Sequence, residues 1–174
     1  MRKIGIYVDG SAPINVASTT NPAGWGVVIV EDPKNHEGGE ILASYAGPVI
    51  TDPDEISYLG AEVGSNNTAE LSAIWWGLYI MRALNLRADD VEVTIYGDSE
   101  YAGKMANGSW KPKENKELVK NVKAIWQRTL LNCNGLVWAH VRAHQGNYYN
   151  EMADELANRG VHLEEDHKPI DIDM

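Results

Sequence analysis

Five stretches of the chain have the hydrophobic patterning of β-strands. Residues 3–9 and 91–97 alternate apolar and polar side chains, which is typical of a strand with one buried face. The other three, 25–31, 41–46 and 136–141, are short apolar runs of strand length.

Three further stretches repeat their apolar residues at helical spacing. Residues 67–86 are apolar around much of the circumference, which predicts a buried helix, and 117–131 has the spacing of an amphipathic helix. A last helix is predicted at 150–160, where Gly160 ends it. Strands and helices therefore alternate after the first three strands. This order predicts a mixed sheet with helices packed on it, the α/β fold class.

The length of 174 residues suits one domain. We expect that domain to occupy residues 1–162, with long loops at 11–24 and 48–65, followed by an acidic, flexible tail at 163–174. The single cysteine, Cys133, excludes an intrachain disulfide, and no apolar stretch approaches the roughly 18–20 residues that span a bilayer. These features predict a soluble, intracellular protein of the cytoplasm with no membrane partner, which we expect to be a monomer.

Two aspartates follow predicted strands in the same sequence frame. Asp9 and Asp98 each lie two residues after a tyrosine, Tyr7 or Tyr96, at the end of an apolar run. If the two strands are neighbours, the carboxylates converge at the sheet edge where open α/β folds form their sites. The alternative is that each aspartate caps a turn.

Two more acids lie in predicted helices. Asn67 and Glu70 fit a capping box at a helix start, yet Glu70 also shares a helix stripe with Ala73 and Gly77 that should face the sheet. Asp154 lies in the first turns of the last predicted helix, where a solvated carboxylate would favour the helix dipole. The sequence leaves both the structural and the functional interpretation open for each acid.

Four carboxylates in one pocket would repel one another unless cations neutralised them. A donor set made of oxygen atoms favours Mg²⁺ or Mn²⁺ over zinc, and two such ions can activate a water and stabilise the leaving oxygen of a phosphodiester. His144, just before Gly146, could move a proton or help product leave. Zinc is not favoured, because His140 and His144 lie across a strand end and no HExxH motif is present.

Several short motifs resemble those of the ribonuclease H type 1 family. They are YVDGS at 7–11, NPAGWG at 21–26, NNTAEL at 66–71, DSEY at 98–101, HQGN at 144–147 and DELA at 154–157. Each motif is weak alone, but together they follow the family's order on the corresponding predicted elements.

The resemblance implies an RNase H-like fold, a five-stranded mixed β-sheet flanked by α-helices, with residues 1–162 as a single catalytic domain. It implies an endoribonuclease that hydrolyses the RNA strand of RNA–DNA hybrids with two metal ions and leaves 5′-phosphate and 3′-hydroxyl ends. Asp9, Glu70, Asp98 and Asp154 would hold the two Mg²⁺ ions, for which Mn²⁺ can substitute. His144 would assist proton transfer or product release.

The same resemblance implies substrate contacts. Asn21, Asn66 and Asn67 would contact the backbone of the hybrid, whose 2′-hydroxyls mark the RNA strand. Glu100 departs from the family, because many members have glutamine at this substrate-contacting position, and here it places a negative charge close to metal and RNA.

Net charge and charge placement point in different directions. The chain has 15 basic and 25 acidic residues, a net charge of −10 that by itself argues against a nucleic acid partner. Yet six of the 15 basic residues fall between Lys111 and Arg128, directly after Trp110. This segment is either a solvated helix face or a stripe that binds phosphates, in which Lys116 and Lys120 contact the backbone and Trp110 packs against a sugar or base.

Two other functions stay open. A related phosphoryl-transfer enzyme of the same fold, such as an exonuclease or an integrase-like transposase, would have a glutamate two residues after Asp9 or at the end of its acid series, where this chain has Ser11 and Asp154. A non-catalytic hybrid-binding module would be favoured by the loss of an acid, and all four are present.

Overall fold

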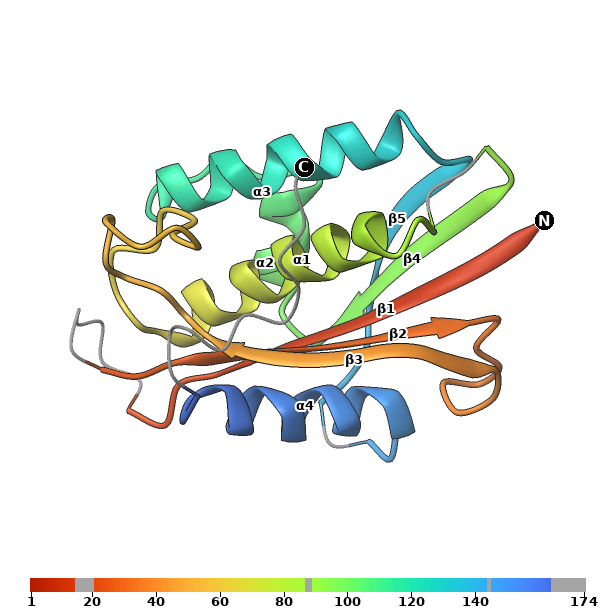
Figure 1. Ribbon diagram of the computed structural model, residues 1–174, viewed down its shortest axis with the longest axis horizontal. Coiled ribbons are helices and arrows are strands. Elements are labelled where there is room, and N and C mark those ends of the chain that lie inside the picture. The colour runs from red at the N-terminus through yellow and green to blue at the C-terminus, as the bar shows by residue number, and fades with distance from the viewer. Residues whose placement is uncertain (15–20, 87–88, 144, 164–174) are drawn as a thin grey trace.

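The computed structural model describes residues 1–14, 21–86, 89–143 and 145–163. Five strands of the described chain form one mixed sheet in the order β3-β2-β1-β4-β5 (Figure 1). Their bounds are β1 (Arg2–Ser11), β2 (Gly24–Glu31), β3 (Glu40–Pro48), β4 (Val91–Gly97) and β5 (Gly135–His140). β2 is antiparallel to both β1 and β3, whereas β4 is parallel to both β1 and β5. The predicted α/β class and mixed sheet are therefore confirmed.

The helices lie on both faces of this sheet (Figure 1). α1 (Asn66–Ala83), α2 (Glu100–Ala106) and α3 (Lys116–Leu130) lie on one face, and α4 (Tyr148–Gly160) lies on the other. Three of them match the predicted helices to within a few residues. α2 has no counterpart among the predicted ranges, because seven residues are too few to show a clear period.

The alternation along β1 divides the core between the two faces. Ile4, Ile6 and Val8 belong to the main apolar core with α1, whereas Tyr7 packs on the other face with Ala153 of α4. A β-carbon at Gly77 would lie 2.8 Å from Ile6 Cγ2, so this stripe of α1 rests directly on β1. The prediction that the stripe carrying Glu70 faces the sheet is thus confirmed.

Ser65, rather than Asn67, caps α1. The Ser65 hydroxyl accepts a hydrogen bond from the Thr68 backbone N–H at 3.2 Å, and the Thr68 hydroxyl accepts one from the Ser65 N–H at 3.0 Å. The capping box considered for Asn67 and Glu70 is therefore wrong. Glu70 lies further into the helix, with 7% of its surface exposed, and its carboxylate takes no part in the cap.

The parallel pairing of β1 with β4 sets the level of the two strand-ending aspartates. Tyr7 is the register partner of Tyr96, and their rings stack with centroids 4.7 Å apart. Asp9 and Asp98 each follow one of these tyrosines by two residues. They therefore lie at the same level along the two strands, as the shared frame predicts.

No helix in the described part of the chain combines the length and the apolar character needed to cross a membrane.

Candidate active site

Three carboxyl groups from distant parts of the sequence meet at the carboxyl ends of β1 and β4. Asp9 lies in β1, Glu70 in α1 and Asp98 directly after β4, and one oxygen of each lies within 4.8 Å of the others. Asp9 is 4% exposed and Glu70 is 7% exposed, whereas Asp98 is half-buried. Ionised acids are rarely this buried without a partner, so the arrangement indicates a functional site.

Gly10 allows α1 to approach β1 closely enough to form this cluster. A β-carbon at this position would lie 2.6 Å from the Glu70 backbone nitrogen and 2.7 Å from the Ala69 β-carbon. The Gly10 N–H also donates a hydrogen bond to Asp9 Oδ1 at 2.9 Å, which orients that carboxylate. The absence of a side chain at residue 10 therefore brings the second acid to the first.

Gly26 plays the matching role on the other face. It is the register partner of Asp9 on β2, and a β-carbon there would collide with the Ala153 carbonyl oxygen and the Ala157 nitrogen of α4. α4 consequently packs tightly beneath the strand that carries Asp9. Asp154, the residue after Ala153, reaches the cluster from this side: it hydrogen-bonds the Asp9 side chain and its charge acts on Asp98.

The acids perturb one another strongly. Burial raises the pKa of the Asp9 carboxyl to about 8, although hydrogen bonds with Glu70 and the Gly10 N–H act in the opposite direction. Burial also raises the pKa of Glu70 well above its ordinary value, and the charge of Asp9 adds to the increase. Burial therefore disfavours the ionised forms of both acids when no cation is bound.

The pKa of Asp98 is raised as well, first by burial and then by the charge of Asp154, while the hydrogen bond with Glu70 lowers it. His140, at the end of β5, acts against this increase. Its Nε2 atom lies 3.1 Å from the Asp98 backbone carbonyl oxygen, to which it donates a hydrogen bond. His144, the histidine assigned to proton transfer from the sequence, lies outside the described residues.

The donor set fits a hard divalent cation. It consists of carboxylate oxygens, with no thiolate, and Mg²⁺ and Mn²⁺ prefer such ligands. Ionising Asp9 and Glu70 together is energetically costly because both are buried and repel each other. The positive charge of a bound cation would remove this cost. The structure thus supports a metal-binding acidic triad, with Asp154 at its edge.

Comparison with known sequences identifies the family. The sequence profile described as RNase H matches residues 1–162. A ribonuclease H of Verminephrobacter eiseniae (strain EF01-2) is 32% identical over 173 residues and is covered to 92%, as is this chain. A ribonuclease H of Francisella tularensis subsp. novicida (strain U112) is 34% identical over 168 residues, which cover 89% of this chain and 88% of the relative. The chain belongs to the RNase H family.

Solved structures of the family have the same fold. LC11-RNase H1, isolated from compost, superposes with a TM-score of 0.68 at 29% identity and covers 92% of this chain and 96% of its own. LC11-RNase H1 in complex with an RNA/DNA hybrid superposes with a TM-score of 0.66 at 26% identity, covering 91% and 96% of the two chains. The relatives are ribonucleases, which makes this RNase H family member a nuclease of the hydrolase class.

The asparagines expected to contact substrate lie around the start of α1. Asn66 Oδ1 accepts a hydrogen bond from the Ala12 backbone N–H at 3.1 Å, so it joins the chain after β1 to the helix. Asn67 is exposed beside it, and Asn21 is half-buried next to Gly64, where a β-carbon would collide with the Asn21 carbonyl. The structure therefore brings these three residues to one side of the acid cluster.

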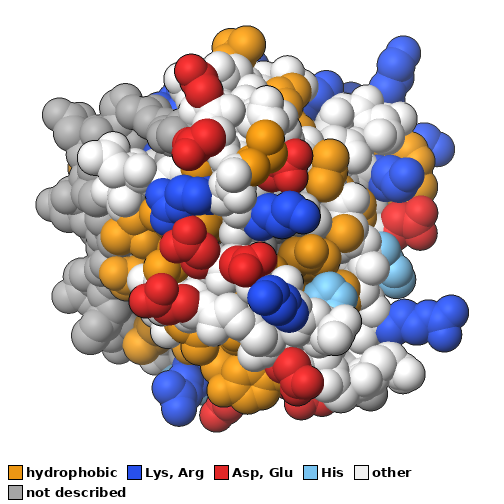
Figure 2. Space-filling view, turned by 90° about the vertical axis from the view of Figure 1, so that its right-hand side faces the viewer, with side chains coloured by type: hydrophobic (Ala, Val, Ile, Leu, Met, Phe, Trp, Pro, Cys, Tyr) orange, Lys and Arg blue, Asp and Glu red, His pale blue; other side chains and the backbone are white. Residues whose placement is uncertain are grey.

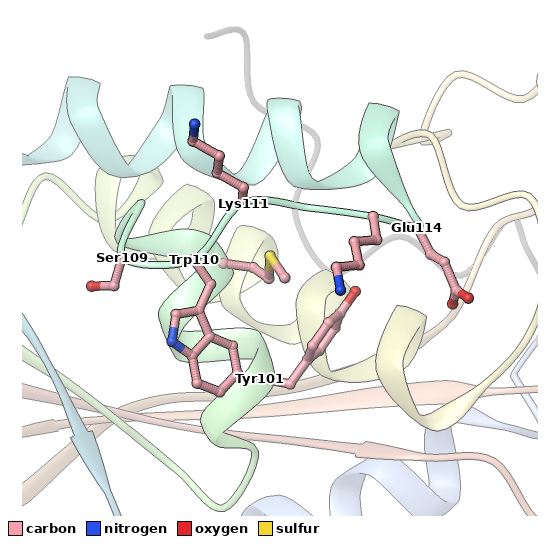
Figure 3. A pocket seen from close by; sticks show the side chains of 7 residues that line it. Tyr101, Ser109, Trp110, Lys111 and Glu114 are labelled. Carbon is pink, nitrogen blue, oxygen red and sulfur yellow. The ribbon is translucent and has the colours of Figure 1, made fainter.

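Trp110 and Tyr101 line a cavity of about 560 Å³. Figure 3 shows the two rings projecting into the same space beneath α3, from α2 and from the loop that follows it. Trp110 is 43% exposed, and Lys111 and Lys113 line the same cavity. The sequence analysis did not predict this cavity, because the nine-residue separation of Tyr101 and Trp110 gives no sign that both line one space.

Two lysines of α3 are exposed near its start. Lys116 and Lys120 lie one turn apart on α3, with both side chains in solvent. At the end of the sheet where β1 and β4 begin, the basic and acidic side chains of the described residues are interspersed on the surface and form no patch of one sign (Figure 2).

Proposed function

We propose that this protein is a metal-dependent endoribonuclease that hydrolyses the RNA strand of RNA–DNA hybrids and leaves 5′-phosphate and 3′-hydroxyl ends. The observation that carries the proposal is the buried cluster of Asp9, Glu70 and Asp98, joined by Asp154, in an RNase H fold. The complex of LC11-RNase H1 with an RNA/DNA hybrid supports the choice of substrate. Residues 1–162 would form the catalytic domain, and 163–174 an acidic tail of which 164–174 lie outside the described residues.

The four acids would hold two Mg²⁺ ions, for which Mn²⁺ can substitute. When bound, these ions would supply Lewis acidity at the scissile phosphodiester and lower the pKa of the attacking water. Burial and the charge of Asp9 raise the pKa of Glu70, so a bound cation would favour the ionised form that acts as a ligand. His144 would accept or deliver a proton at the reacting oxygen through its imidazole nitrogen.

Substrate positioning would come from both sides of the acids. Asn21, Asn66 and Asn67 would hold the RNA backbone and its 2′-hydroxyls next to the start of α1. Across the site, a sugar or base of the hybrid would pack against Trp110 in the cavity it shares with Tyr101. The cytoplasmic location and the monomeric state expected from the sequence stay predictions.

The substrate panel is the most direct test of this function. We expect cleavage of a labelled RNA–DNA hybrid in magnesium, with little cleavage of duplex RNA, duplex DNA or single strands. Chelation should abolish the reaction because the buried acids then lose their cations. End analysis should find 5′-phosphate and 3′-hydroxyl groups. Equal cleavage of all substrates, or cleavage that survives chelation, would contradict the proposal.

Lys116 and Lys120 provide a second, smaller prediction. Replacing both with alanine should raise the KM for hybrid and reduce the slope of log affinity against log salt by about two, one for each phosphate contact. A control with the same change of net charge is the double replacement of Lys34 and Arg159, which are exposed outside α3. If both double variants change the salt dependence equally, the α3 lysines belong to a solvated helix face.

A further inference from the structure

The loop between β2 and β3, residues 32–39, has a backbone shape that few side chains favour. Asp32, Asn35 and His36 are all in the left-handed region, with φ angles of 53°, 51° and 61°. Residues other than glycine rarely adopt this conformation, and they keep it where surrounding contacts hold them in place. The contacts made by this loop therefore indicate what it does.

Tyr149, in the first turn of α4, hydrogen-bonds three consecutive carbonyl groups of the β2–β3 loop. Its backbone N–H donates to the His36 carbonyl oxygen at 3.3 Å. Its hydroxyl donates to the carbonyl oxygens of Glu37 and Gly38, each at 3.0 Å. The side chain is only 2% exposed. Because both the backbone and the side chain of Tyr149 are held, the loop fixes the rotation of α4 about its axis as well as its position along that axis.

His36 joins the same loop to the two central strands. Its Nδ1 atom is hydrogen-bonded to the Tyr7 hydroxyl of β1 at 2.8 Å. Its ring also makes edge contacts with the rings of Tyr7 and Tyr96, at centroid distances of 5.7 and 4.9 Å. The Tyr149 ring packs on Tyr7 from the helix side, with centroids 5.2 Å apart. The β2–β3 loop therefore contacts β1, β4 and α4 in one place.

Each of these three elements carries or leads into an acid of the cluster. Asp9 in β1 and Asp98 after β4 each lie two residues beyond the tyrosine that His36 contacts. Asp154 lies five residues after Tyr149, a little more than one helical turn along α4. A displacement of the first turn of α4 relative to the strands would therefore move Asp154 relative to the other acids.

On the basis of the proposed function, we infer that Tyr149 is a positioning residue that acts through the β2–β3 loop to place Asp154 in the metal site. Gly26 lets α4 approach the sheet closely, but closeness alone leaves the helix free to rotate or slide. The hydrogen bond between Asp154 and Asp9 depends on both motions. Mg²⁺ requires nearly ideal octahedral geometry, so a small displacement of one carboxylate weakens its binding. Groups that orient a metal ligand contribute to affinity without touching the metal.

The first experiment compares wild type with Tyr149→Phe, which removes only the hydroxyl and keeps the buried ring. Mn²⁺ is titrated calorimetrically into each protein at about pH 8, with no nucleic acid present. The Kd should increase about fivefold in the variant, the effect of losing one neutral hydrogen bond. Cleavage should require a correspondingly higher Mg²⁺ concentration for its half-maximal rate, whereas the KM for hybrid at saturating Mg²⁺ should stay within about twofold of wild type. An unchanged Kd would overturn the inference.

The matched control is Thr129→Val, which also removes one buried hydroxyl. The Thr129 side chain lies in α3 and donates a hydrogen bond to the Ile125 carbonyl oxygen at 2.7 Å. Both variants should have a lower melting temperature than wild type, but only Tyr149→Phe should bind Mn²⁺ more weakly. An equal increase of Kd in the two variants would reflect a general loss of stability and would overturn the positioning role.

His36→Asn tests whether the loop transmits the effect. Asparagine tolerates a left-handed backbone, so this variant removes the imidazole contacts with Tyr7 and Tyr96 and keeps the shape of the loop. It should also raise the Kd for Mn²⁺, and the double variant with Tyr149→Phe should raise it less than the product of the two single effects, because both act through one loop. Effects that multiply independently would overturn the role of the loop.

The two proposals fail in different ways. Absence of metal binding or of hybrid cleavage by wild type would reject the proposed function. If wild type binds Mn²⁺ and cleaves hybrid, and Tyr149→Phe binds Mn²⁺ with the same Kd, only the role of Tyr149 is rejected.

Discussion

Replacing Asp9 with asparagine is expected to reduce the rate of hybrid cleavage by at least about a thousandfold. Asp9 is the centre of the acid cluster, because Glu70 and Asp154 hydrogen-bond it and the charge of Asp98 acts on it. Asparagine keeps the shape but supplies no charge for a cation, and each 1.4 kcal/mol of lost transition-state stabilisation is a factor of about ten in rate. The measurement is single-turnover cleavage of a defined hybrid in saturating magnesium.

The fold should survive this change. The amide oxygen of the new side chain can still accept the hydrogen bond from the Gly10 N–H, and asparagine has no ionised form for burial to penalise in the metal-free protein. The melting temperature in chelator should therefore be equal to or higher than that of wild type. Asp90→Asn, at the other end of the sheet where β4 begins, is the matched control and should retain activity. Near-normal turnover by Asp9→Asn would refute the metal assignment.

The affinity for magnesium should depend steeply on pH. Burial raises the pKa of Asp9 to about 8, and Glu70 is raised as well, so protons compete with the cation below that pH. For each proton displaced, the apparent Kd should increase about tenfold per pH unit below about pH 8, and it should level off above it. Isothermal titration with magnesium at several pH values measures this. A Kd that is constant from about pH 6 to about pH 9 would contradict the shared burial of the acids.

The same shifts lower the stability of the metal-free protein as the pH rises. Asp9 titrates near 3.8 in the unfolded chain and at about 8 in the folded protein, so the folded state holds more protons within this window. The free energy of unfolding consequently decreases as the pH increases through it. Magnesium, which binds the folded state, should reverse the trend.

Glu70→Gln isolates this contribution from other titrating groups. Glutamine resembles the protonated form of Glu70, so the variant should lose less stability than wild type between about pH 5 and about pH 9 in chelator. Thermal melts of the two proteins over that range provide the comparison. Parallel curves would show that Glu70 does not carry the raised pKa.

Much of this protein can be predicted from its sequence because local pattern determines local structure. Strand alternation and helical spacing depend on neighbours in the chain, and they located the five strands and the three longer helices to within a few residues. The common frame of Asp9 and Asp98 relative to Tyr7 and Tyr96 also required only the period of a strand. The sequence pattern did not predict α2, because this helix is too short to show a period.

The tertiary structure decided which of these residues meet and in what state. The cap of α1 at Ser65 and Thr68 left Glu70 for the cluster, a choice that the sequence had left open. Gly10 and Gly26 hold α1 and α4 close to β1 and β2, and this close approach makes four separate acids into one site. The raised pKa values and the Tyr101–Trp110 cavity follow from the same packing. Distances between side chains far apart in the sequence are set by sheet order and by how closely the helices pack. Local patterning could therefore name the acids, but only the fold could show that they meet.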